Sequence, residues 1–131
     1  MVAAPAHGPL KVLVVDDSPL IQQRLRALFG ELPNVRVVGG AEDVAGAVAA
    51  VDALHPDLVV LDVELAHGDK GLGVVEHVHA HHPEVQVIAL SNFTLQAIRD
   101  TYLRAGACAY FDKALEFDRA RQWVRDLAVP R

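Results

Sequence analysis

The chain has 131 residues, of which 52% are hydrophobic and 22% are charged, and its formal net charge at pH 7 is −5. This length accommodates one compact domain with a core and leaves no room for a second folded domain. The acidic balance and the absence of any Lys/Arg run argue against nucleic-acid binding, and no apolar stretch approaches the ~20 residues that span a bilayer.

Residues 1–9 are small and interrupted by Pro and Gly, without the basic start and long apolar stretch of a signal peptide. We expect a flexible lead-in there, one domain over residues 10–129, no output domain after it and a cytoplasmic location. Cys108 is the only cysteine, so it has no partner for an internal disulfide and is predicted to be a small buried side chain.

Apolar runs alternate with amphipathic segments from the start of the domain. Residues 11–16 predict a strand that ends in Asp16-Asp17, and Ser18-Pro19 then forms a helix start, because the hydroxyl can cap free N–H groups and proline suits the first helical position. This helix should end near Gly30. Its predicted inner face is Ile21, Leu25, Leu28 and Phe29, and its predicted outer face is Gln22, Gln23, Arg24 and Arg26.

Two further strands and a helix follow. Residues 35–40 predict a short strand at or near a sheet edge, with Arg36 as its single charged side chain. Asp43 can cap a second helix, whose inner face would be Val44, Ala47, Val48 and Val51. Residues 58–65 form an apolar run that carries Asp62, and such a run is typical of a strand buried on both faces.

The second half of the chain continues the alternation. A polar loop over 66–70 leads from Gly71 into a third helix that Pro83 ends, and strand 85–90 precedes Ser91-Asn92. A helix is predicted over 93–106, a brief strand over 109–111, and a last helix from Glu116. The residues expected on the inner faces of these three helices are Val74, Val75 and Val78, then Leu95, Ile98, Tyr102 and Ala105, then Phe117, Ala120, Val124 and Leu127.

Five strands that alternate with five helices predict right-handed crossovers and a parallel sheet covered on both faces. A closed (β/α)8 barrel would need roughly twice the chain. We therefore predict an α/β fold, an open doubly wound five-stranded sheet of flavodoxin-like strand order 2-1-3-4-5.

In such a sheet the residues just past each strand meet at one edge. Each of them has an ordinary explanation alone, as a turn, a helix cap or a solvated surface charge. Their joint occurrence after the first, third, fourth and fifth strands points instead to a ligand or reaction site at this edge. The predicted site residues are Asp16, Asp17, Asp62, Ser91 and Lys113.

Carboxylates held close together repel one another unless a cation lies among them. Mg²⁺ (or Mn²⁺) suits oxygen ligands and keeps waters that a phosphate oxygen can replace, which suggests phosphoryl chemistry. Asp62 would be the nucleophile and would form an aspartyl phosphate, with Asp17 on the metal and Lys113 and Ser91 holding phosphoryl oxygens.

This set of residues, with Ala105-Gly106-Ala107 before the last strand, closely resembles the receiver domain of bacterial two-component response regulators. The resemblance implies that a histidine kinase or a phosphotransfer protein donates a phosphoryl group to Asp62. It also implies that Asp17 and Asp62 bind Mg²⁺ directly together with the backbone carbonyl of Glu64, and that Asp16 acts largely through water.

The resemblance further implies a switch without enzymatic output. Ser91 would move to bond the phosphoryl oxygen, Tyr110 would turn inward, and the fourth helix, fifth strand and fifth helix would present an altered surface to an unknown protein target. The chain is expected to be a stand-alone receiver that is monomeric or weakly dimeric.

Four features depart from the usual pattern of this family. Ala114 replaces the proline that usually follows the lysine, and because a cis bond before alanine would cost roughly 3–4 kcal/mol we expect a trans bond and a differently set loop. Asn92 is larger than the usual residue after the hydroxyl position. Glu64 could place another carboxylate near the metal, and the loop from Asp62 to Gly71 is one residue longer than is common.

The third helix is rich in histidine, and His77 and His81 have the i, i+4 spacing of a metal pair. With no third ligand evident, a solvated helix face is the preferred interpretation of this cluster, which also contains His79 and His82. Trp123 is predicted to be edge packing on the last helix.

Two other functions remain open at this point. A haloacid-dehalogenase-like, Mg²⁺-dependent phosphatase or phosphotransferase also forms aspartyl phosphate, but it requires Asp-x-Asp after the first strand, where this chain has Asp16-Asp17-Ser18. A flavodoxin would place a flavin phosphate at the same position, where these acidic side chains would repel it.

Overall fold

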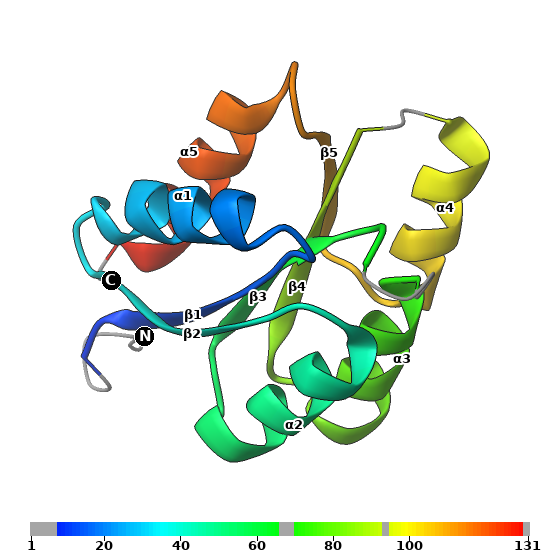
Figure 1. The fold of residues 1–131 in the computed structure, drawn as a ribbon, viewed down its shortest axis with the longest axis horizontal. Coiled ribbons are helices and arrows are strands. Elements are labelled where there is room, and N and C mark those ends of the chain that lie inside the picture. Colours follow the sequence, from blue (N-terminus) through cyan, green and yellow to red (C-terminus); the bar gives the residue numbers. More distant parts are fainter. Residues whose placement is uncertain (1–7, 66–69, 93–94, 130–131) are drawn as a thin grey trace.

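The computed structural model describes residues 8–65, 70–92 and 95–129. Within these ranges a parallel sheet has the strand order β2-β1-β3-β4-β5, which confirms the predicted flavodoxin-like order (Figure 1). The strands are β1 (Leu10–Val15), β2 (Val35–Ala41), β3 (Leu58–Asp62), β4 (Gln86–Ser91) and β5 (Ala109–Asp112). The helices are α1 (Pro19–Gly30), α2 (Val44–Leu54), α3 (Leu72–His81), α4 (Gln96–Ala105) and α5 (Phe117–Ala128).

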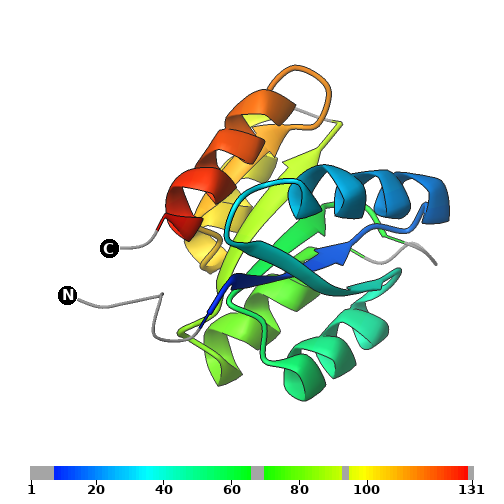
Figure 2. The same ribbon diagram turned by 90° about the vertical axis from the view of Figure 1, so that its left-hand side faces the viewer.

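The helices form two layers, one on each face of the sheet (Figure 2). Helices α1 and α5 cover one face, where Phe29 and Val124 pack on Val12 and Val60. Helices α2, α3 and α4 cover the other face and enclose the neighbouring strand residues, such as Val59. Because successive strand residues point to opposite faces, each central strand supplies both cores.

Strand β3 lies at the centre of the sheet between β1 and β4. All of its residues are buried, as the apolar run predicted, and Asp62 is the last of them. The pairing of β3 with β1 extends to Leu61 and its pairing with β4 extends to Asp62, so the end of β3 that carries Asp62 is fixed within the sheet.

Both predicted helix caps are present. Ser18 accepts a hydrogen bond at Oγ from the Ile21 N–H (3.3 Å), and Asp43 accepts one at Oδ1 from the Gly46 N–H (2.7 Å). These side chains satisfy N–H groups that the first turn of a helix leaves without intrahelical partners. In the part of the chain that the structure describes, no helix combines the length and apolar character needed to cross a membrane.

Three predictions about single side chains were wrong. Leu95 is 62% exposed, because its backbone is extended and α4 begins at the next residue. Cys108 is exposed, because the preceding Ala107 takes the buried position while the Cys108 N–H donates to the Val87 carbonyl (2.7 Å). Gln22 is only partly exposed and makes the contacts described below.

Parts of other predictions lie outside the described residues. They are residues 1–7 of the lead-in, positions 66–69 of the polar loop and the first two residues of the helix predicted over 93–106. Trp123 packs against the core under α1 and α5, which agrees with its predicted role as edge packing.

Candidate functional site

The structure brings the predicted site residues to the carboxyl edge of the sheet. Asp16 and Asp17 directly follow β1, Asp62 ends β3, Ser91 ends β4, and Lys113 directly follows β5. Asp16 and Ser91 are each 1% exposed and Asp62 is 8% exposed, whereas Asp17 faces solvent. The site is therefore a set of buried polar groups with one exposed carboxylate at its mouth.

Lys113 joins two of the carboxylates. Its Nζ lies 2.7 Å from Asp16 Oδ2 and 3.3 Å from Asp62 Oδ2. Burial lowers the pKa of Lys113, but the hydrogen bond that Lys113 donates to Asp16 and the charges of Asp62 and Asp16 outweigh it, so the pKa ends above its ordinary value. Lys113 is consequently a fixed positive charge at neutral pH.

The charged form of Asp62, unlike that of Lys113, is destabilised, because its carboxylate is buried and poorly solvated. The pKa of Asp62 is raised from 3.8 to about 6: burial is the main cause, Lys113 and the Glu64 N–H counteract it, and the neighbouring Asp16 charge adds to it. That N–H donates to Asp62 Oδ1 at 3.2 Å. Asp62 is thus ionised at neutral pH but remains short of compensating positive charge.

The donor set fits a hard divalent cation. One carboxylate oxygen from each of Asp16, Asp17 and Asp62 can lie within 4.8 Å of the other two. Three carboxylates face the single ammonium of Lys113, so the cluster carries an excess of negative charge. Oxygen-only ligands with uncompensated charge are what Mg²⁺ prefers.

The backbone after β3 wraps closely around Asp62. Gly71 N–H donates to the Val63 carbonyl (2.8 Å), and Glu64 and Lys70 form an isolated antiparallel bridge. A Cβ on Gly71 would lie 2.7 Å from the Asp62 carbonyl oxygen, so only glycine fits this approach. Glu64 itself is exposed, and its predicted carbonyl contribution to the metal stays a prediction.

Ser91 and two tyrosines lie beside the acidic cluster. Ser91 lines a cavity of about 210 Å³ together with Tyr102 and Thr101 of α4. Tyr102 donates to the Val63 carbonyl (3.3 Å), and burial raises its pKa to about 12. The predicted switch residue Tyr110 is 4% exposed, with its ring edge against Tyr102 at a centroid distance of 5.9 Å.

The loop between β5 and α5 is organised without proline. Asp112 Oδ1 accepts from the Ala114 N–H (2.9 Å) and the Leu115 N–H (2.7 Å), while the Asp112 N–H donates to Glu116 Oε1 (2.9 Å). No cis peptide occurs in the described ranges, so the Lys113–Ala114 bond is trans as predicted. The sequence analysis did not predict these hydrogen bonds, although an acidic residue at each end of the loop is a known signal for side-chain capping of backbone N–H groups.

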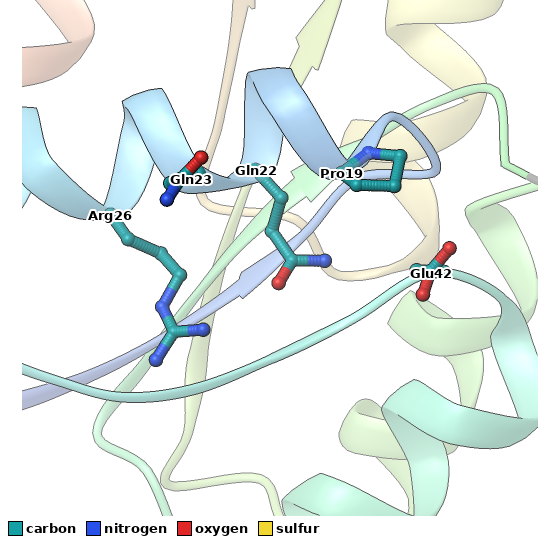
Figure 3. Close-up of a pocket in the computed structure, with 5 residues that line it drawn as sticks. All are labelled: Pro19, Gln22, Gln23, Arg26 and Glu42. Carbon is teal, nitrogen blue, oxygen red and sulfur yellow. The ribbon is translucent and has the colours of Figure 1, made fainter.

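Gln22 is the other contributor that the sequence pattern missed. Its Nε2 donates to the Asp16 carbonyl (3.3 Å) and the Ala41 carbonyl (3.1 Å), and so ties α1 to the ends of β1 and β2. The side chain lines a groove of about 450 Å³ between α1 and the segment after β2 (Figure 3). Gly40 leaves the room that the amide occupies, because a Cβ there would lie 2.1 Å from Gln22 Oε1.

Comparison with known proteins agrees with this geometry. Residues 12–125 match the family described as the response regulator receiver domain. The chain belongs to this family. Receiver domains are phosphoacceptor switches of two-component systems and bind Mg²⁺ in an acidic pocket, which corresponds to the cluster of Asp16, Asp17 and Asp62.

Two curated relatives of the receiver domain are longer than this chain. The DNA-binding transcriptional activator DevR/DosR of Mycobacterium tuberculosis is 34% identical over 123 residues, 93% of this chain and 56% of that protein. Protein-glutamate methylesterase/protein-glutamine glutaminase 2 of Koribacter versatilis is 34% identical over 110 residues, 82% of this chain and 30% of that protein. The response regulator domain of Thermotoga maritima CheB matches with a TM-score of 0.79 and 28% identity, covering 92% of this chain and 93% of that one.

The two alternative families are not supported. At the position where a haloacid-dehalogenase-like enzyme needs its second aspartate, the receiver domain uses Ser18 as a helix cap. A flavin phosphate would meet Asp16 and Asp17 at the end of β1.

Proposed function

We propose that Asp62 accepts a phosphoryl group from a phosphohistidine of a histidine kinase or a phosphotransfer protein. The observation that carries this proposal is the meeting of three carboxylates within 4.8 Å with Lys113 Nζ in contact with two of them. The bond that forms joins a carboxylate oxygen of Asp62 to phosphorus, and the bond that breaks joins phosphorus to the donor's imidazole nitrogen, which keeps the electron pair.

The chain's own residues provide the nucleophile and the positioning. With a pKa of about 6, Asp62 is mostly ionised at pH 7, and it is oriented by the Glu64 N–H. Lys113 offers its positive charge to a phosphoryl oxygen beside Asp62, and the pKa shift keeps it protonated. Asp16 holds Lys113 through the 2.7 Å contact and is itself held by the Ser18 N–H (3.0 Å).

A divalent ion completes the site in this proposal. Asp17 and Asp62 would bind Mg²⁺ or Mn²⁺ directly, Asp16 would act through water, and the Glu64 carbonyl would be a further ligand. When bound, the ion supplies positive charge that neutralises the phosphoryl oxygens during transfer.

The proposed output is a changed protein-binding surface on α4, β5 and α5. Ser91 would move towards the phosphoryl group, and Tyr110 would respond to that movement. Two contacts link these residues to the surface, since the Lys113 N–H donates to the Ser91 carbonyl (2.7 Å) and Arg99 Nη1 of α4 donates to the Tyr110 carbonyl (3.0 Å). Leu95 and Leu115, 62% and 85% exposed, offer apolar contact area at the ends of this surface.

The length of the relatives bears on the output as well. The chain spans 56% and 30% of two curated relatives, whose names describe DNA binding and methylesterase activity. The stand-alone organisation, the cytoplasmic location, and a monomeric or weakly dimeric state stay predictions from the sequence.

Acetyl phosphate with Mg²⁺ tests the acceptor directly. We expect the protein to gain one acid-labile phosphoryl group by intact-mass spectrometry, and Asp62→Asn to gain none. Asp118→Asn, which changes an exposed aspartate of α5, is the matched control and should be labelled like the unchanged protein. Equal labelling of the Asp62→Asn variant would overturn the assignment. A phosphotransfer screen against histidine kinases then identifies the donor.

A further inference from the structure

A second group of potential metal ligands lies between α2 and α3, away from the acidic site. Within the described residues it consists of Asp52 on α2, His77 on α3 and His82, which caps the end of α3. The two helices pack side by side on the same face of the sheet (Figure 1). The sequence singled out His77 and His81 and offered no third ligand, whereas the structure groups His77 and His82 with Asp52 of the neighbouring helix.

The three side chains point at a common position. His77 Nε2 lies 2.9 Å and His82 Nε2 lies 2.7 Å from the same oxygen, Asp52 Oδ1. The imidazole side chains are 21% and 17% exposed, whereas that of Asp52 is 51% exposed. The rings are thus held by the helix interface, and the carboxylate is free to adjust on the solvent side.

The spacing is close to that of a tetrahedral metal site. Zinc bonds of about 2.0–2.2 Å place neighbouring ligand atoms about 3.3–3.6 Å apart. The nitrogen-to-oxygen separations of 2.9 and 2.7 Å would have to open by roughly 0.4–0.9 Å, which rotation of the exposed Asp52 side chain can supply. Two more imidazoles border the group, His81 with its ring 4.7 Å from that of His77 and His55 with its ring 6.2 Å from that of His82.

We propose that Asp52, His77 and His82 bind a zinc-class transition-metal ion that links α2 to α3, with water or a bordering histidine as the fourth ligand. Two imidazoles and one carboxylate suit Zn²⁺ and its neighbours, whereas Mg²⁺ and Ca²⁺ prefer oxygen-only sites. The ion is therefore of a different class from the one proposed beside Asp62. This inference does not depend on phosphoryl transfer.

The location sets this site apart from the acidic one. Asp52 and His82 lie just before β3 and β4 begin, whereas Asp62 and Ser91 end those strands. The two sites are therefore at opposite edges of the sheet. A metal bridge at the amino edge would stabilise the packing of α2 on α3 without occupying the phosphoryl site.

Zinc titration of the untagged, chelator-treated protein tests the proposal. We expect one Zn²⁺ to bind per chain by calorimetry, and Co²⁺ to give the visible absorption of a tetrahedral complex. His77→Ala and His82→Ala should each weaken Zn²⁺ binding by at least about tenfold, because each removes a ligand. Thermal unfolding should shift upwards with Zn²⁺ in the unchanged protein and not in these variants.

Two control variants separate this site from other sources of binding. His79→Ala removes an exposed histidine of the same helix that is outside the ligand group and should bind Zn²⁺ like the unchanged protein. Asp62→Asn should also retain Zn²⁺ binding. Absence of binding, equal affinity in His77→Ala, or loss of binding in Asp62→Asn would each overturn the proposal.

Discussion

Asp62 and Asp52 are both aspartates in contact with basic side chains, yet the fold gives them opposite chemical environments. Asp62 ends the central strand and is raised in pKa to about 6, chiefly by burial. Asp52 lies on the outer side of α2, and hydrogen bonds from His77 and then His82 lower its pKa. The first carboxylate is destabilised in its charged form, and the second is stabilised.

The difference shows how the two edges of one sheet serve different purposes. At the carboxyl edge the buried carboxylate of Asp62 belongs to the end of a strand, where solvation is poor. Its ionised form therefore lowers the stability of the fold. At the amino edge the polar groups are carried by helix ends, where water and neighbouring imidazoles compensate them. Reactivity is therefore expected at Asp62 and structural binding at Asp52.

The largest expected effect concerns the charge on Asp62. A raised pKa means that protonation of Asp62 stabilises the fold fully below about pH 3.8, and that this contribution is lost as the pH rises through about 6. Asp62→Asn removes the charge, so at pH 7 without divalent ions it should be more stable than the unchanged protein by about 2 kcal/mol, after allowance for solvent screening. Urea unfolding at pH 4 and pH 7 measures the difference.

The controls for this prediction use pH and metal. The stability difference between the two proteins should fall to about 0.5 kcal/mol at pH 4, and Mg²⁺ should reduce it at pH 7 by stabilising only the unchanged protein. Asp118→Asn, on the exposed surface of α5, should have the same free energy of unfolding as the unchanged protein at both pH values and the same response to Mg²⁺. A variant that is less stable than the unchanged protein at pH 7 would show that Asp62 is compensated in the metal-free fold.

The position of the site at the carboxyl ends of the strands could be predicted from the sequence, because the strand topology alone brings its residues together. Once the alternation of strands and helices is recognised, parallel strands bring Asp16, Asp62 and Lys113 together whatever the details of packing. Buried strands and helix caps were predictable for a similar reason. Ser18 and Asp43 act within one turn of their own helices, so local sequence determines them.

The features that were missed depend on how neighbouring elements are rotated against each other. Asp52 meets His77 across 25 positions of sequence, and only the packing of α2 on α3 brings them together. Gln22 reads as an outer-face residue by helical period, but the adjacent ends of β1 and β2 offer it two carbonyls. The helical periodicity of apolar residues describes the faces of a single helix and does not show which groups of neighbouring elements lie against them.

A smaller effect is expected at Gln22, which supports the acidic edge from α1. Gln22→Ala loses both hydrogen bonds to the Asp16 and Ala41 carbonyls and should lower the free energy of unfolding by about 1 kcal/mol. Gln23→Ala is the matched control, because Gln23 lines the same groove but is exposed (Figure 3). Phosphorylation by acetyl phosphate should also slow in Gln22→Ala and not in Gln23→Ala. Identical urea midpoints for Gln22→Ala and Gln23→Ala would show that the hydrogen bonds of Gln22 do not stabilise the fold.

The smallest expected effect is at Asp52 and has the opposite sign from that at Asp62. Because its pKa is lowered, the stability contributed by the Asp52 charge is present above about pH 3.8 and is lost as the pH falls through the folded-state pKa. With a chelator present, Asp52→Asn should therefore be marginally less stable than the unchanged protein at pH 7 and indistinguishable from it in strong acid. The side chain is 51% exposed and asparagine still accepts a hydrogen bond, so the loss should be close to the error of urea unfolding. A clear gain in stability at pH 7 would mean that Asp52, like Asp62, is a carboxylate whose charge the fold does not compensate.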